Sequence, residues 1–101
     1  MNLQVHGFDW DEGNRAKREK HGVSIREIED LFARRPRVAP DPRHSVDEDR
    51  LIAVGRGNTG RPLFVAFTMR TKDKRRLIRP VTARYMHAKE IAAYEKESST
   101  P

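Results

Sequence analysis

The pattern of apolar and polar residues changes from helical to strand periodicity near the middle of the chain. Between Ser24 and Phe32, apolar residues recur three and four positions apart, which predicts a helix with one face on the core. Ser24 and Glu27 form an S-x-x-E capping box at its start. Residues 50–56 (RLIAVGR) and 62–70 (PLFVAFTMR) instead predict two strands, and the GNTG between them favours a hairpin.

The residues before this helix predict a short strand and a polar helix. The strand lies within residues 3–10, and the polar helix follows over residues 11–21 with Asp9 or Asp11 as its cap. Core burial alone cannot hold a helix with so few apolar residues, so it either faces solvent or presents its basic side chains to a ligand. Gly22 fits the C′ position, where a left-handed residue ends a helix.

The second half of the chain predicts further strands and a closing helix. A short strand is expected around Val38 and a longer one over residues 75–83, where Pro80 marks an edge position, a bulge or a strand break. A helix over residues 87–97 follows. This order predicts a small α+β domain with helices packed on one face of an antiparallel sheet.

Length and composition narrow the class of protein. A chain of 101 residues suits one domain, which we expect over residues 1–97 with a frayed tail over residues 98–101. The absence of cysteine excludes disulfides and thiolate metal sites and fits a reducing cytoplasm. No apolar run reaches the roughly 20 residues of a membrane span, and the N-terminal MNLQVHGFDWDEG lacks the apolar region of a signal peptide. We therefore expect a soluble, cytoplasmic protein that does not bind membranes.

The charge is unevenly distributed along the chain. The formal net charge is +6, yet the segment from Arg50 to Arg84 holds ten Lys or Arg residues and a single acid, Asp73. A basic segment beside an acidic remainder indicates a surface that faces a polyanion such as nucleic acid. The alternative is a solvated basic sheet face without a ligand.

Arginines stand at the ends of the predicted strands. A guanidinium group can donate two parallel hydrogen bonds to a phosphate, which makes these residues candidates for phosphate binding. Alternation places Arg79 on the same face of its strand as Ala83, unless Pro80 shifts the register. The alternative is a set of surface salt bridges to helix acids, each worth little. The four arginines are Arg56, Arg70, Arg79 and Arg84.

Metal-independent RNA cleavage needs a base for the 2′-hydroxyl, cations for the charged transition state and an acid for the leaving oxygen. Lys20, His21, His44 and the arginines could fill these roles. The four histidines are not spaced as metal ligands are, for example as H-x-x-x-H. The adjacent acids at Asp47–Asp49 are typical of a loop residue cluster that improves solubility. The GRGNTGR segment lacks the features of a P-loop. We therefore expect no cofactor and no metal.

Several segments in a fixed order resemble the BrnT family of bacterial type II toxins. They are FDWDEGNRAKREKHGVSIREIEDLF, PDPRHSVDEDRLIAVGR, LFVAFTMR and VTARYMHAKEIAAYE, and together they run from Phe8 to Glu95. The resemblance implies a RelE-like fold, with N-terminal helices and a C-terminal helix packed on a small twisted, mainly antiparallel sheet. It also implies an RNA endonuclease that inhibits translation, acting on RNA that is free or on the ribosome. A BrnA-type antitoxin would neutralise the toxin and bring it to operator DNA.

The resemblance also indicates site residues. Lys20 and His21 match the family's KHG, His44 matches its loop, Arg56 matches the arginine after a glycine, and Arg84 matches the arginine of its S-A-R strand end, which reads T-A-R here. His87 departs from the family, which has a small hydroxyl residue at the start of the last helix. The catalytic candidates are Lys20, His21, Arg56, Arg79 and Arg84, and the phosphate-binding candidates are Lys17, His44, Arg70 and Arg76.

Two other functions fit the same residues. A non-catalytic module that docks nucleic acid or a partner through its basic face would show binding without cleavage. A ParE-like gyrase poison would share the fold and disturb DNA supercoiling rather than translation.

Overall fold

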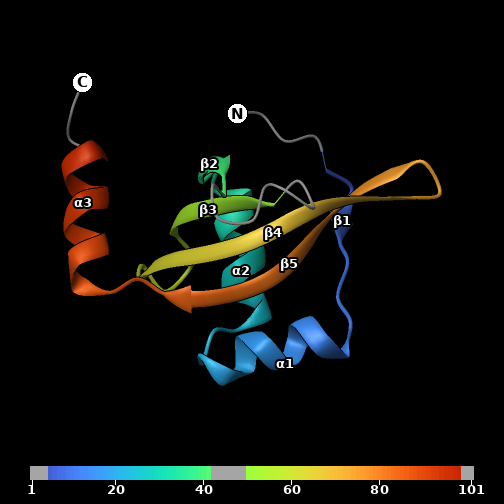
Figure 1. The fold of residues 1–101 in the computed structure, drawn as a ribbon, viewed down its shortest axis with the longest axis horizontal. Coiled ribbons are helices and arrows are strands. Elements are labelled where there is room, and N and C mark those ends of the chain that lie inside the picture. The colour runs from blue at the N-terminus through green and yellow to red at the C-terminus, as the bar shows by residue number, and fades with distance from the viewer. Residues whose placement is uncertain (1–4, 42–49, 99–101) are drawn as a thin grey trace.

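The computed structural model describes residues 5–41 and 50–98 of the chain (Figure 1). It has the α+β composition that the sequence predicts. His44, Asp47–Asp49 and the predicted tail beyond Ser98 lie outside the described residues. The elements are β1 (Gly7–Phe8), α1 (Glu12–Lys20), α2 (Ile25–Ala33), β2 (Arg37–Pro40), β3 (Leu51–Arg56), β4 (Pro62–Lys72), β5 (Arg75–Tyr85) and α3 (Ala88–Ser98).

The strands form one mixed sheet in the order β1-β5-β4-β3-β2. The meander from β2 to β5 is antiparallel, as predicted, and β1 pairs with β5 in parallel. The GNTG hairpin and the turn before β5 are both present, and Asp73 and Lys74 adopt positive φ in the second turn. The sheet is therefore mainly antiparallel, with a short parallel edge.

A β-bulge lies beside Pro80, one of the outcomes that the sequence predicted. Ala66 pairs with Thr82 and Phe67 pairs with Pro80, so Val81 is an extra residue in β5. The extra residue shifts the alternation of side chains along the strand. Ala83 consequently faces the core, while Arg79 faces the opposite side of the sheet. The prediction from regular alternation, which placed the two residues on the same face, is therefore wrong.

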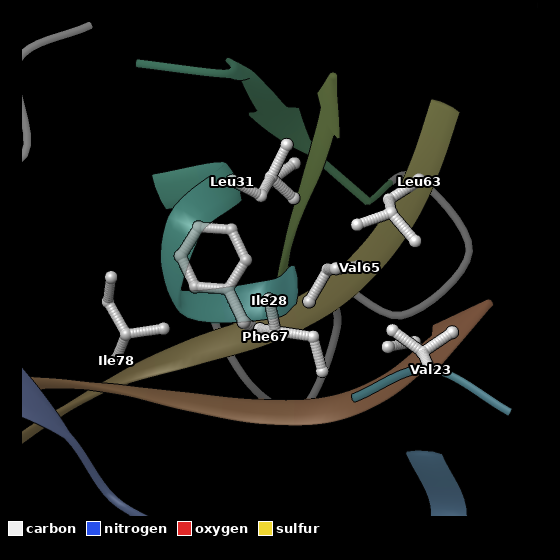
Figure 2. Close-up of a cluster of buried hydrophobic side chains, with 9 residues drawn as sticks. Val23, Ile28, Leu31, Leu63, Val65, Phe67 and Ile78 are labelled. Atoms are coloured by element: carbon white, nitrogen blue, oxygen red, sulfur yellow. The ribbon is translucent and has the colours of Figure 1, made fainter. Parts of the chain in front are cut away.

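The core lies between α2 and one face of the sheet (Figure 2). Ile28 and Leu31 of α2 pack against Leu63, Val65 and Phe67 of β4, and all five side chains are fully buried. The predicted capping box is present, since Glu27 N donates to Ser24 Oγ and the Glu27 side chain accepts from Ser24 N. Periodicity and capping thus position α2 as the sequence predicts.

Polar contacts hold α1, as its composition requires. Asp11 caps the helix and Asn14 completes a capping box, while Asn14 Nδ2 also donates to Asp9 O at 2.9 Å. Arg18 Nη1 donates to Val23 O at 3.1 Å and thereby ties α1 to the start of α2. Gly22 ends the helix with a φ of +73°, in agreement with the prediction.

The position of α3 differs from the expected packing of all helices on one sheet face. Figure 1 shows α3 at the end of the strands and apart from α1 and α2. Ile91 and Tyr94 are only half-buried, and the exposed Ala92 and Ala93 add no core contact. Because α3 offers so little apolar surface, side chains from the sheet hold it by charge and ring contacts instead.

Candidate functional site

Four predicted arginines share one side of the sheet. We call the side opposite to Leu63, Val65 and Phe67 the outer face. Strand alternation and the bulge at Val81 together place these arginines there, because Arg56 pairs with Pro62, Arg79 with Thr68 and Arg84 with Phe64. Without the bulge, Arg79 and Arg84 would point to opposite faces. The outer-face arginines are Arg56, Arg70, Arg79 and Arg84.

Two of them meet around one carboxylate, in what we call the Asp9 cluster: Asp9, Asp11, Arg70, Lys72 and Arg79. Asp9 Oδ2 lies 3.0 Å from Arg70 Nη1 and 3.6 Å from Arg79 Nη1, and Asp9 Oδ1 lies 3.4 Å from Lys72 Nζ. Arg79 also pairs with Asp11. Three cations face two carboxylates, so the cluster keeps a net positive charge that can attract an anion.

Hydrogen bonds keep the carboxylate of Asp11 ionised. The backbone of Asn14 and then the Arg79 guanidinium donate to it, and they hold the pKa of Asp11 below its usual value. The side chain of Asp9 is only 10% exposed, while that of Arg70 is 46% exposed. Asp9 therefore forms the buried centre of the cluster, and Arg70 and Lys72 form its accessible part.

Arg84 and Glu90 form a two-pronged ion pair at the end of β5. Arg84 Nη1 and Nη2 donate to Glu90 Oε1 and Oε2 at 2.6 Å and 2.9 Å. Glu90 Oε1 also accepts from the His87 backbone N–H at 2.8 Å. These bonds, those from Arg84 first, outweigh burial and lower the pKa of Glu90 to about 2, while Glu90 raises the pKa of Arg84.

Two more basic residues reach α3 from the same end of the sheet. Arg56 Nη2 donates to Glu95 Oε1 at 2.8 Å, and the Arg37 guanidinium lies 5.0 Å from the centre of the Tyr94 ring. The α3 clamp, as we call this set, comprises Arg37, Arg56 and Arg84 of the sheet and Glu90, Tyr94 and Glu95 of α3. The sequence alternative of salt bridges to helix acids therefore describes Arg56 and Arg84 in this structure.

Lys20 and His21 lie on the helix side of the sheet rather than on the outer face. The turn that contains them approaches the end of β5, where Tyr85 Oη lies 3.5 Å from Gly22 O. Both side chains are exposed, and within the described ranges neither has a hydrogen-bonding or ionic side-chain partner. The structure thus brings the KHG turn to the end of β5, where Lys20 and His21 make no such side-chain contact with the residues that the structure describes.

A polar group beside this turn is absent from the sequence prediction. Glu27 is buried, and its carboxylate accepts from Tyr85 Oη at 2.7 Å and from Thr59 Oγ1 at 2.9 Å. The Arg61 guanidinium lies 3.5 Å from the centre of the Tyr85 ring. The capping box was the only visible signal for Glu27, because its other partners come from distant parts of the chain.

The pKa values of this pair move apart. Burial raises the pKa of Glu27, but the hydrogen bonds from Tyr85, Thr59 and Ser24 outweigh it, so the net shift is downward. Burial, followed by the hydrogen bond to Glu27 and then by the negative charge of Glu27, raises the pKa of Tyr85. The carboxylate is therefore ionised at neutral pH and the phenol is protonated.

The remaining predicted residues are spread over the molecule. Lys17 is exposed on α1, and Arg76 is exposed near the turn between β4 and β5. Over residues 5–41 and 50–98, no group of three or more His, Cys, Asp or Glu side chains could hold a metal ion. In the same part of the chain, no helix is long and apolar enough to span a membrane.

Comparison with known proteins identifies the family. A family model described as "Ribonuclease toxin, BrnT, of type II toxin-antitoxin system" matches residues 10–90, which is most of the chain. A search of curated proteins finds no match. The match includes the KHG turn and the outer-face arginines. The chain therefore belongs to the BrnT family of ribonuclease toxins from type II toxin–antitoxin systems.

Proposed function

We propose that this protein is an RNA endonuclease toxin with a RelE-like domain over residues 1–97, whose outer face binds the RNA backbone. The bulge at Val81 is the observation that carries the proposal, because it places Arg79 and Arg84 on the same face as Arg70. Bulges frequently redirect side chains near active sites. A row of guanidinium groups suits a chain of phosphates.

The proposed reaction does not require a metal ion. The 2′-hydroxyl attacks the adjacent phosphorus, a base takes its proton, and an acid protonates the leaving 5′-oxygen. Arg56 and Arg84 would stabilise the negative charge that develops on the phosphoryl oxygens. Lys20 would assist proton transfer, and His21 is the second candidate for that role.

The end of β5 is where these residues can act together. Arg84 and Tyr85 are consecutive and point to opposite faces of the sheet, and Tyr85 contacts the KHG turn. An RNA strand that passes over the end of β5 would meet Arg84 on one side and Lys20 on the other. The Asp9 cluster, with Arg70 and Arg79, would bind phosphates farther along the outer face.

The biological role follows from the family. We propose that RNA cleavage inhibits translation in the cytoplasm and that a BrnA-type antitoxin neutralises the toxin. The toxin would reach operator DNA only through that complex. RNA on the ribosome is an alternative substrate to free RNA.

Incubation of the purified protein with a defined single-stranded RNA in EDTA tests the enzyme. We expect fragments from the wild type and from Lys74→Ala, which removes an exposed cation near the β4–β5 turn, at the opposite end of the sheet from α3 (Figure 1). Lys20→Ala and Arg79→Ala should lose cleavage while they retain part of the RNA binding. If the wild-type protein cuts neither free RNA nor RNA in a translation extract, the proposal is wrong.

A non-catalytic binding module is the second candidate, and one observation favours it. Within the described residues, the Lys20 side chain has no partner that could tune it for proton transfer. Such a module would bind the oligonucleotide with a steep salt dependence, and Lys20→Ala would change binding alone. A ParE-like poison would instead alter plasmid supercoiling.

A further inference from the structure

Charge contacts, rather than burial, hold α3 on the sheet. Of its residues up to Lys96, none is fully buried, and Ile91 and Tyr94 are only half-buried. Its contacts with the sheet include the Arg84–Glu90 pair, the Arg56–Glu95 pair and the Arg37–Tyr94 ring contact. The Arg56–Glu95 pair is exposed and the Arg84–Glu90 pair is only partly buried, so other ions in solution can compete with both. A helix attached in this way can be displaced by a stronger anion.

We propose that α3 is a displaceable cover on the RNA site, in which Glu90 and Glu95 occupy the guanidinium groups of Arg84 and Arg56 until RNA phosphates replace them. The carboxylates of α3 stand in for two phosphates of the RNA backbone. The inference rests on the proposed function, because it assigns a regulation to the same arginines. Because RNA must first displace these carboxylates, the docked α3 lowers the affinity of the protein for RNA.

The geometry of the Arg84 pair matches what a phosphate needs. The two nitrogen atoms of one guanidinium fork donate to the two oxygen atoms of one carboxylate, at 2.6 Å and 2.9 Å. The same fork can donate to two phosphoryl oxygens. A phosphodiester can therefore take the place of Glu90 without any rearrangement of Arg84.

Both arginines are anchored in the sheet independently of α3. The Arg84 guanidinium lies 4.4 Å from the centre of the Phe64 ring, and Arg56 Nη1 donates to Gly60 O at 2.7 Å. Phe64 and Gly60 belong to the β3–β4 hairpin and its turn, not to α3. When α3 leaves, the two guanidinium groups consequently keep their positions and bind phosphate with little loss of side-chain entropy.

The connection between β5 and α3 allows such a movement. Met86 N donates to Pro62 O at 3.0 Å, and Ile91 N donates to His87 O at 2.9 Å. The first bond belongs to the end of the sheet and the second to the first turn of α3. The segment between Met86 and Ala88 can therefore act as a hinge while β5 keeps its pairing with β4.

The Asp9 cluster provides the contrast. Asp9 follows β1, and its N–H donates to Ile78 O in β5 at 2.8 Å, so its carboxylate is fixed in the framework. It organises Arg70 and Arg79 and cannot swing away. Unlike Asp9, Glu90 and Glu95 belong to an element that can leave as a unit.

Binding of a non-cleavable 2′-O-methyl RNA oligonucleotide tests the inference. We expect the double variant Glu90→Gln/Glu95→Gln to bind the oligonucleotide about tenfold more tightly than the wild type does. This fold-change corresponds to about one charge-assisted hydrogen bond that RNA no longer has to break. Because the wild type must break two ion pairs that salt weakens, its binding should fall less with rising salt, so the variant should show the steeper slope of log K against log salt. The matched control is Glu12→Gln/Glu29→Gln, which makes the same change in net charge on α1 and α2 and should differ little from wild type.

Hydrogen exchange on the wild type provides an independent readout. The oligonucleotide should accelerate amide exchange in residues 91–96 of α3 and leave the core amides of β4 protected. The inference is overturned if RNA binds while α3 exchange stays constant or slows, or if the two double variants bind equally. Those outcomes leave the ribonuclease proposal intact. If no variant binds or cuts RNA, the proposed function itself fails, and the cover has nothing to regulate.

Discussion

Two helices of similar length, α2 and α3, are attached to the same sheet in opposite ways. The nine-residue α2 buries Ile28 and Leu31 completely against β3 and β4. The 11-residue α3 is held largely by Arg84, Arg56 and Arg37 from three different strands. The free energy gained by burying apolar side chains depends little on salt or pH. Ion pairs that solvent can reach weaken as the salt concentration rises and as low pH protonates their carboxylates. The difference indicates that α2 stays packed on the sheet under all folding conditions, whereas the docking of α3 depends on salt and pH.

The difference also separates two kinds of arginine contact. In the Asp9 cluster, three cations converge on a carboxylate that the sheet holds in place. In the α3 clamp, each arginine meets a residue of a helix that has little other support. The first arrangement organises cations for a ligand, and the second competes with a ligand for them.

Truncation of one apolar residue in each helix should give the largest contrast. Leu31→Ala removes a fully buried side chain, and we expect it to lower the free energy of unfolding by about 2–5 kcal/mol. Ile91→Ala removes a half-buried side chain and should cost less than about 1 kcal/mol. Urea denaturation of both variants checks this. Equal costs would show that α3 contributes to the core after all, and the comparison between the helices would break.

Removal of one polar contact from α2 should have a smaller effect. Tyr85→Phe deletes the hydroxyl that donates to the Glu27 carboxylate at 2.7 Å, and we expect a cost of about 1–2 kcal/mol in urea denaturation. Because the core still holds α2, its amide exchange should change together with that of β4. Faster amide exchange in α2 without a change in β4 would show that α2, like α3, depends on polar contacts. Tyr94→Phe, which keeps the ring beside Arg37, is the matched control.

The sequence predicts local structure well because its signals are local. The helix over α2 follows from apolar spacing and from Ser24 and Glu27, which lie three residues apart. Gly22 and Pro80 mark a helix end and a bulge through their own backbone preferences. Each of these features depends on residues within one or two turns of the chain.

The candidate site is less predictable because it depends on long-range pairing. Strand-end arginines can be recognised from the sequence, but their partners Asp9 and Glu95 lie 61 and 39 residues away from Arg70 and Arg56. The Glu27–Tyr85 pair spans 58 residues and has no local signal. The position of α3 is unpredictable for the same reason, since charge contacts leave no periodic pattern. Tertiary structure, rather than propensity, decides which cations remain available.

The pH dependence of α3 is the smallest expected effect and the most selective one. The pKa of Glu90 is lowered to about 2 from its usual 4.5 by Arg84, so the ionised form stabilises the docked helix. This stabilisation is fully present above about pH 4.5 and is lost as the pH falls towards 2. Since the Glu90 side chain is 35% exposed, we expect a contribution on the order of 1 kcal/mol, below the full linkage value.

Amide chemical shifts recorded by NMR between pH 6 and pH 2 can follow this release. We expect α3 signals to shift towards unfolded values before those of β4, because the core does not depend on Glu90. Loss of the Asp11 or Glu27 carboxylate, whose pKa values are also lowered, would instead appear first in α1 or α2. In Glu90→Gln the α3 transition should vanish, and its signals at pH 6 should already resemble those of the wild type at low pH. A simultaneous shift of α3 and β4 would contradict the view that charge holds α3 separately from the core.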